Sequence, residues 1–225
     1  MKVTPQEKTI LDAALEVVAR ETISRTRMHL IAEEAGMSQS NLHYHFKTKD
    51  ALMKALFCMI QDTFTERRKQ DAVDPDTPVE SQIAHFFQEP RRLLDEDWRY
   101  ETVQIDFWLY AHTEPEMQEL FDESYEGWRE QAIRLIAQAY PEIPAETQRA
   151  LGYIMVSMFV GAVMQIMNRA DFDLDRYFEV CTNLILLELN KLHQGVSLVP
   201  KQSAPRERVS FRGRFYHACT VDGAV

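Results

Sequence analysis

The 225-residue sequence contains little glycine, little proline and almost no cysteine. Its 7 glycines and 9 prolines, beside 45% hydrophobic and 27% charged residues, favour a helical globular protein over a fibrous or disordered one. The 3 cysteines, Cys58, Cys181 and Cys219, form no CxxC pair and have no histidine at metal-ligand spacing. We therefore expect neither a zinc site nor a disulfide framework. A reducing cytoplasm is the expected location.

The sequence also lacks the short motifs of common catalytic and targeting segments. It has no glycine-rich phosphate loop, no GxSxG, no HExxH and no ExxH pair of the kind used by carboxylate di-iron bundles. His43 and His45 form an HxH sequence, but residues two apart on a helix point in different directions. The N-terminus, MKVTPQEKTI, has no apolar run that would indicate export. We expect no enzyme activity, no cofactor and no metal.

The excess of acidic residues is confined to the middle of the chain. The whole sequence has 25 Lys and Arg against 35 Asp and Glu, a formal charge of −10. Residues 1–54 hold 8 basic and 7 acidic side chains (net +1), residues 55–190 hold 11 and 26 (net −15), and residues 191–225 hold 6 and 2 (net +4). The nearly neutral N-terminal segment can therefore approach a polyanion that the acidic body would repel.

One stretch is long and apolar enough to be considered for a membrane. Residues 151–167 (LGYIMVSMFVGAVMQIM) carry no charge. The length of this uncharged stretch is near the lower limit of roughly 17 residues for a spanning helix. Gln165, Ser157, Tyr153 and two glycines dilute it. We predict a helix buried inside the protein, hydrophobic on all sides, and no membrane association.

Helical periodicity runs through the whole chain, so we predict an all-α fold. The first helix opens at Thr4-Pro5-Gln6-Glu7, which supplies an N-cap hydroxyl, a proline at the first helical position and a Glu for a capping box. It should end near Glu21. Thr26 can cap a second helix that stops near Gly36. The remaining helices are predicted at 38–45, from Thr48 onward, and at 78–88, 95–111, 115–140, 144–169 and 174–192.

The segment Ile31 to Ser38 joins two of these helices through a short turn that contains glycine, the geometry of a helix-turn-helix. The helix after the turn reads SQSNLHYHF and is almost uncharged, with many amide, hydroxyl and imidazole groups. Leu42 and Phe46, spaced i and i+4, should anchor it to the two preceding helices. A short polar helix held in this way fits the major groove of DNA, where amide and hydroxyl groups read base edges.

At this point the sequence resembles the tetracycline-repressor family of regulators. The matching positions run from about Gln6 to Leu56, and the first helix (ILDAALEVVA) and the start of the fourth (FKTKDALMKAL) fit as well. They are Thr26, Ile31, Ala32, Ala35, Gly36, Ser38, Leu42, His45, Phe46, Lys49, Ala51 and Leu52. The resemblance implies a three-helix DNA-binding domain (1–50), a larger helical ligand-binding and dimerisation domain (51–193) and, from the change in composition, a flexible tail (194–225).

The resemblance also implies a set of DNA-binding residues. Base edges would face Gln39, Ser40, Asn41 and His43, beginning at the cap Ser38, and phosphates would contact Thr26, Arg27, Tyr44 and Lys49. The chain departs from the family at three positions. The usual Tyr after Leu42 is His43, a glycine that commonly follows the first helix is Thr22, and a common Thr is Arg27. Arg27 can supply a phosphate contact directly.

A single domain of this kind covers one half-site, so a homodimer is expected. The two most apolar helices, 144–169 and 174–192, are the candidates for its interface, with Gly152 and Gly161 allowing close backbone approach; an ordinary monomer core is the other interpretation. The acidic body is rich in aromatic residues, and Asp106 falls on one helical face with Val103 and Tyr110. A carboxylate among aromatic rings suits a cationic or aromatic effector. The predicted effector site comprises Asp106, Phe107, Tyr110, Trp128, Met155 and Phe159.

Two functions from different classes follow. The first is a ligand-controlled repressor that a small molecule releases from a palindromic operator. The second is a helical bundle that binds a small molecule or a protein partner without operator DNA. His43 and the low charge of the N-terminal segment favour the second, whereas the fifty-residue pattern favours the first.

Overall fold

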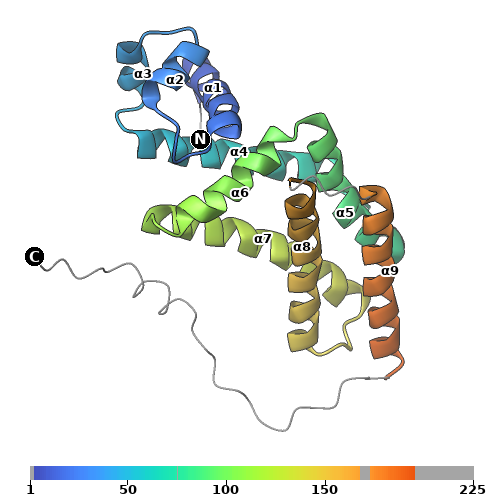
Figure 1. The fold of residues 1–225 in the computed structure, drawn as a ribbon. Coiled ribbons are helices and arrows are strands. Elements are labelled where there is room, and N and C mark those ends of the chain that lie inside the picture. The colour runs from blue at the N-terminus through green and yellow to red at the C-terminus, as the bar shows by residue number, and fades with distance from the viewer. Residues whose placement is uncertain (1–2, 75, 168–172, 196–225) are drawn as a thin grey trace, which may run out of the picture.

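The computed structural model describes residues 3–74, 76–167 and 173–195. In these ranges the chain forms helices and no strand, which confirms the all-α prediction (Figure 1). The helices are α1 (Pro5–Glu21), α2 (Met28–Glu34), α3 (Gln39–His45), α4 (Lys49–Gln70), α5 (Val79–Glu96), α6 (Arg99–Ala111), α7 (Pro115–Ala139), α8 (Ala145–Met167) and α9 (Leu174–His193). The end of the predicted 144–169 helix and residues 196–225 of the predicted tail lie outside the described residues.

The start of α1 is fixed by local hydrogen bonds, as the sequence predicts. Thr4 Oγ1 accepts the Glu7 backbone N–H at 3.2 Å, and the Glu7 carboxylate accepts the Thr4 N–H at 2.8 Å, which completes the capping box. At the other end, Thr22 has φ 72°, a conformation that glycine adopts without steric cost. The family's preference for glycine at this position therefore has a backbone cause.

The turn between α2 and α3 also forms as predicted, but the start of α2 does not. Gly36 has φ 64°, and Met37 N–H donates to Ala32 O at 2.9 Å across the turn. The predicted cap Thr26 is wrong, because Arg27 occupies the N-cap position and its side chain makes no capping bond. The hydroxyl of Thr26 instead donates to Thr22 O at 2.7 Å.

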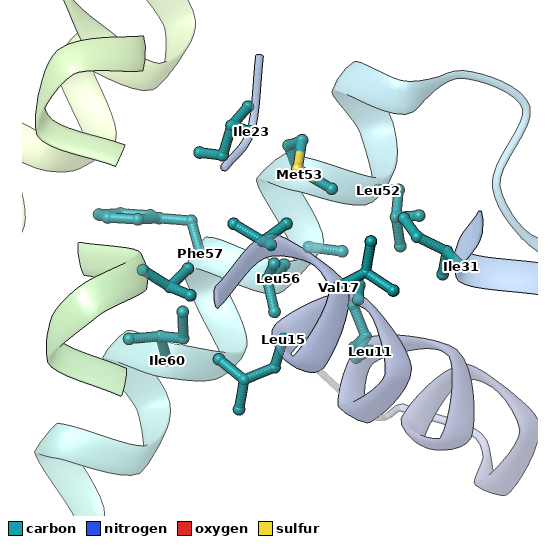
Figure 2. Packing of buried hydrophobic residues seen from close by; sticks show 14 of the residues in the cluster. Leu11, Leu15, Val17, Ile23, Ile31, Leu52, Met53, Leu56, Phe57 and Ile60 are labelled. Carbon is teal, nitrogen blue, oxygen red and sulfur yellow. The ribbon is translucent and has the colours of Figure 1, made fainter. Parts of the chain in front are cut away.

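The first four helices enclose a hydrophobic core that extends into α6 and α7. Figure 2 shows Val17 of α1 and Leu56 of α4 near the middle of the view, with Ile31 of α2 beside Leu52. Phe57 extends this core outward, since its ring lies 5.2 Å from that of Phe107 in α6 and 5.8 Å from that of Phe121 in α7. We call this cluster the N-terminal core. It crosses the predicted domain boundary at residue 50, which stays a prediction.

The structure corrects the two helices predicted at 78–88 and 95–111. A single helix, α5, continues from Val79 to Glu96 through Pro90, and α6 begins only at Arg99. Proline usually ends a helix because it has no N–H and its ring crowds the preceding turn. Here the buried Leu93 lies beyond Pro90, so burial of the last turn of α5 offsets the lost hydrogen bond.

A second core joins α5, α7, α8 and α9. Phe178 of α9 stacks between Phe87 of α5 and Phe159 of α8, with ring centroids 5.6 Å apart in each pair. Figure 1 shows α8 and α9 side by side at the end of the molecule away from α1, α2 and α3. The recognition elements and the predicted dimerisation helices therefore occupy opposite ends.

Gly152 permits a close contact of α7 with α8. A Cβ on Gly152 would lie 2.5 Å from Ile133 Cγ1 and 3.3 Å from the Arg129 carbonyl oxygen. Gly161 has no atom of the described chain within 4 Å of its would-be Cβ, so the prediction of close approach holds within one chain for Gly152 alone.

We expect Gly152→Ala to lower the free energy of unfolding by about 1–3 kcal/mol, because the Ile133 side chain must shift and the α7 backbone must give slightly to admit the methyl group. Gly127→Ala is the matched control on α7, where a Cβ meets nothing within 4 Å. The control should stabilise by up to ~1 kcal/mol through helix propensity. Thermal melts at equal protein concentration measure both changes. Equal melting temperatures for the two variants would contradict the packing argument.

The long apolar helix α8 is not enclosed by a single chain. By length and composition it is the one helix among the described residues that could cross a membrane, and 39% of its most apolar window is buried. The prediction of a fully buried helix is therefore wrong for the isolated chain. Its exposed apolar side chains, together with those of α9, form what we call the α8–α9 face: Tyr153, Ile154, Met164, Met167, Val180, Leu184 and Leu187.

Candidate DNA-binding surface and effector cavity

The helix α3 is anchored by its two apolar residues and capped by the residue before it. Leu42 is fully buried, and Phe46, directly after the helix, is buried as well. Ser38 Oγ accepts the Asn41 N–H at 3.2 Å, and the Phe46 N–H donates to Leu42 O at 2.9 Å. These contacts are the predicted ones, and they turn the remaining side chains of α3 away from the core.

The outward face of α3 carries most of the predicted DNA-binding residues. Gln39, Ser40 and Asn41 are exposed, and Tyr44 is 74% exposed. Gln39 Nε2 lies 3.5 Å from Nε2 of the half-buried His43. This face therefore offers amide, hydroxyl, phenol and imidazole groups to one ligand surface, which is the donor and acceptor set that base edges in a major groove require.

Two predicted phosphate contacts are turned inward in the structure. Thr26 is fully buried and its hydroxyl bonds within the α1–α2 connector, so its prediction as a phosphate ligand is wrong. Lys49 Nζ donates to the Ile23 carbonyl oxygen, and burial lowers the pKa of Lys49. Its ammonium group therefore holds the connector in this conformation and is not free for a phosphate.

The exposed cations beside α3 are Arg25, Arg27 and Lys47. Lys47 Nζ lies 5.8 Å from the centroid of the Tyr44 ring, which places a positive charge next to the predicted recognition helix. Arg25 has only a distant pairing with Glu21, at 3.7 Å. Sequence reasoning missed Arg25 and Lys47, although the position of Lys47 between α3 and α4 is a usable signal.

Three polar contacts connect α6 to the DNA-binding helices. The Asp106 carboxylate accepts the Ile23 backbone N–H, and burial raises the pKa of Asp106. Tyr110 OH donates to Asp50 Oδ1 at 2.9 Å, and Arg99 Nη1 donates to Glu16 Oε2 at 2.6 Å. Asp106 was expected to hold an effector, but its partner is the α1–α2 connector, which corrects that expectation.

The six predicted effector residues do not form one site. Phe107 is fully buried in the N-terminal core. Asp106 contacts the α1–α2 connector, and Tyr110 contacts α4. Trp128 and Phe159 pack together in the second core with ring centroids 5.6 Å apart, and Met155 is fully buried there. Of the six, Trp128 lines two cavities in the described part of the chain.

Trp128 lines an inner and an outer cavity in the helical body. The inner cavity, of about 40 Å³, is enclosed by α4, α5, α6, α7 and α8, and its lining includes the carboxylates of Glu89 and Glu101. A larger outer cavity of about 260 Å³ lies between α4, α5 and α7. Arg68, Glu89 and Trp128 line both cavities and therefore stand between them.

Burial dominates the electrostatics of the inner cavity. Glu89 is 8% exposed and Glu101 9% exposed, and desolvation raises the pKa of both. For Glu101, burial and then the like charge of Glu89 raise the pKa to about 8, while Arg68 opposes the shift. Sequence reasoning missed both carboxylates. Glu89 could have been found, because it falls on the same helical face as Phe86 and Leu93.

No cluster of three or more His, Cys, Asp or Glu side chains in the described residues is arranged to hold a metal ion. The two candidate binding regions of the described structure are the exposed polar helix α3 at one end and the buried acidic cavity in the helical body. The class of protein that this arrangement defines is a helix-turn-helix DNA-binding regulator with a separate helical body.

Comparison with known proteins identifies the family. Residues 10–56 match the model for bacterial regulatory proteins of the tetR family, and residues 91–189 match the model for the C-terminal region of BetI-type transcriptional repressors. The chain therefore belongs to the tetracycline-repressor (TetR) family, whose members are DNA-binding transcription factors and not enzymes.

Two curated relatives match over part of their length. The fatty acid metabolism regulator protein of Bacillus subtilis is 30% identical over 34% of this chain and 39% of its own. The HTH-type transcriptional regulator RutR of Escherichia coli is 42% identical over 27% of this chain and 28% of its own. The matched region thus spans less than half of either relative.

Solved structures with the same fold cover nearly the whole described chain. A TetR-like regulator from Rhodococcus has a TM-score of 0.69 at 16% identity and covers 82% of this chain and 96% of its own. FadR of B. subtilis, in complex with stearoyl-CoA, has a TM-score of 0.64 at 20% identity and covers 84% of this chain and 99% of its own. A regulator of Saccharomonospora viridis, in complex with choline, has a TM-score of 0.65 at 20% identity and covers 84% of this chain and 95% of its own. At these identities the likeness shows the fold alone.

Proposed function

We propose that the chain is a homodimeric repressor that binds operator DNA through α3 and leaves it when a small molecule binds the helical body. The observation that carries the proposal is the outward polar face of α3, which Leu42 and Phe46 hold on a packed three-helix scaffold. The proposed DNA contacts are Arg25, Arg27, Ser38, Gln39, Ser40, Asn41, His43, Tyr44 and Lys47. Such a protein would act in the cytoplasm, where its operator lies.

The α8–α9 face supports the homodimer. Its exposed Leu, Val, Ile, Met and Tyr side chains follow helical spacing along two adjacent helices, and a second copy would remove them from water. A dimer formed through this face places one α3 in each subunit at the far ends of the assembly. Two such helices can occupy half-sites about 34 Å apart or a multiple of that distance.

The helix α6 supports a route from the effector to the operator. Near its start, Glu101 and Gln104 line the inner cavity, and near its end, Asp106 and Tyr110 contact the connector and α4. A ligand that favours a shifted α6 would favour a different separation of the two α3 helices. Release then follows from the difference in ligand affinity between the two arrangements.

Operator binding should depend steeply on salt. Fluorescence anisotropy with the promoter fragment of the chain's own gene measures the dissociation constant at several salt concentrations. Three exposed cations per subunit give about six phosphate contacts per dimer, so we expect affinity to fall by about 10³ between 50 and 200 mM salt. Lys47→Ala should make the slope of log K against log salt shallower by about 2, one contact per subunit.

Arg134→Ala is the matched control, because Arg134 is an exposed cation on α7 that pairs with Glu130 at 3.2 Å, far from α3. It should leave the slope unchanged. Absent or salt-insensitive binding would instead favour a bundle that binds a small molecule or a protein partner without operator DNA.

A further inference from the structure

The inner cavity holds an unbalanced set of buried charges. Arg68 is the cation that acts on both Glu89 and Glu101, and burial lowers the pKa of Arg68. Arg67 acts on Glu89 as well, but it is paired with Glu96. Among the described residues Glu101 has no hydrogen-bond partner and no ion pair within 4 Å, although it is 9% exposed and lines the cavity. Arg68 donates only a long bond, of 3.4 Å, to Thr65. A buried carboxylate without a partner is costly unless it is neutralised by a proton or by a cation.

Aromatic rings surround these carboxylates. Phe64, Tyr125 and Trp128 line the same cavity, and the Tyr125 and Trp128 rings lie 6.0 Å apart in an edge-to-face arrangement. Burial and then the nearby Glu101 raise the pKa of Tyr125, while Gln104 and the cation Arg129 oppose the shift. Ring faces next to a carboxylate are suited to an organic cation, which gains both cation–π and ionic attraction there.

We propose that the inner cavity binds a small organic monocation, a quaternary ammonium or a protonated amine, with Glu101 as its counter-ion and Tyr125 and Trp128 against its apolar surface. This inference rests on the proposed function and names the chemical class of the effector. Arg68 acts on both carboxylates and can balance one of them, so one carboxylate is left for the ligand.

Binding requires that the two cavities merge. The inner cavity, at about 40 Å³, has room for one or two water molecules. Ligand sites are usually at least about 300 Å³, a size that the inner and outer cavities reach only together. Movement of Trp128 or Arg68, which separate them, would open the path from the outer cavity and would displace the helices that carry these side chains.

The cation should compete with a proton for Glu101. The groups that face Glu101 are Arg68 from α4, Glu89 from α5 and Tyr125 from α7, whereas Glu16 of α1 is paired with Arg99. Below its pKa, Glu101 holds a proton in the empty cavity, and the cation binds after that proton leaves. Affinity should therefore rise with pH, by up to tenfold per unit, and should level off above about pH 8.

Isothermal titration calorimetry with three probes of increasing size tests the proposal. The probes are tetramethylammonium, choline and benzyltrimethylammonium, and the neutral control is 3,3-dimethylbutan-1-ol, in which carbon replaces the choline nitrogen. We expect at least one cation to bind, its affinity to increase from pH 6 to pH 8, and the neutral alcohol to bind at least a hundredfold more weakly than choline if choline binds. Sodium 3,3-dimethylbutanoate, an anion of similar shape, should not bind.

Glu101→Gln keeps the shape of the side chain and removes its charge. At pH 8 this variant should bind the cation at least tenfold more weakly than the unmodified protein, and its affinity should no longer change with pH. Glu123→Gln, an exposed change of the same charge on α7, should behave like the unmodified protein. If Glu101 had a merely structural role, Glu101→Gln would weaken cation binding by the same factor at every pH. The pH profile therefore separates a counter-ion role from a structural one.

Three results would overturn the inference: no binding of any cation, equal binding of the neutral or anionic probe, or an unchanged pH profile in Glu101→Gln. Anisotropy with operator DNA on the same samples keeps the two proposals apart. Intact operator binding without cation binding would remove the effector class and leave the repressor standing. Cation binding without operator binding would remove the repressor and leave the cation site standing.

Discussion

Leu184→Glu should convert the dimer into a monomer and reduce operator affinity by two to four orders of magnitude. Leu184 is 52% exposed in the single chain and lies between Val180 and Leu187 on the α8–α9 face. A carboxylate in the middle of an apolar interface would lose its hydration without an opposite charge, which opposes association. The second half-site then loses the benefit of linkage, which typically contributes about 10²–10⁴ in affinity.

Analytical ultracentrifugation measures the oligomeric state, and anisotropy measures the operator affinity. Leu109→Glu is the matched control, because Leu109 is 63% exposed on α6 and lies outside the α8–α9 face. It should remain a dimer with normal affinity. If Leu184→Glu also sedimented as a dimer, the interface would have to be sought elsewhere on the molecule.

Phe57→Ala should destabilise the protein by about 3–5 kcal/mol, the usual cost of deleting a buried aromatic ring. The ring is almost fully buried and contacts Phe107 and Phe121, so its loss opens a cavity where α4 meets α6 and α7. At roughly 2–4 °C per kcal/mol for a chain of this size, the melting temperature should fall by on the order of 10 °C. Urea denaturation at fixed protein concentration gives the free energy.

Tyr44→Ala provides the opposite outcome. Its side chain is 74% exposed, so stability should change by less than about 0.5 kcal/mol. Operator affinity should nevertheless fall, because Tyr44 is among the proposed DNA contacts on α3. Loss of stability in Tyr44→Ala would contradict the outward display of α3. Normal stability in Phe57→Ala would contradict the packing of α4 against α6 and α7.

The features that sequence predicts best are those fixed within a few residues. The capping box of Thr4 and Glu7, the caps of Ser38 and Thr48, and the glycine turn at Gly36 each depend on contacts no more than five residues apart, and all are present. The all-α fold follows from the same local periodicity. Pro90 failed as a stop because the burial of α5 beyond it outweighs a local preference.

The features that sequence missed depend on distant segments. The partners of Ile23 are Lys49, 26 residues away, and Asp106, 83 residues away, so no spacing rule reveals that both hold the α1–α2 connector. Glu89 and Glu101 come together only after α5 and α6 pack against α4 and α7. Thr26 matched the family pattern, but its burial depends on how the connector folds back toward Thr22.

The 13-residue length of α6 has a consequence for re-engineering this protein as a biosensor. The α6 residues that line the inner cavity and those that contact the α1–α2 connector and α4 are less than three helical turns apart. Substitutions that retune α6 toward a new chemical will therefore alter the leakiness of the uninduced promoter as well. Variants should be selected simultaneously for low background expression and for response.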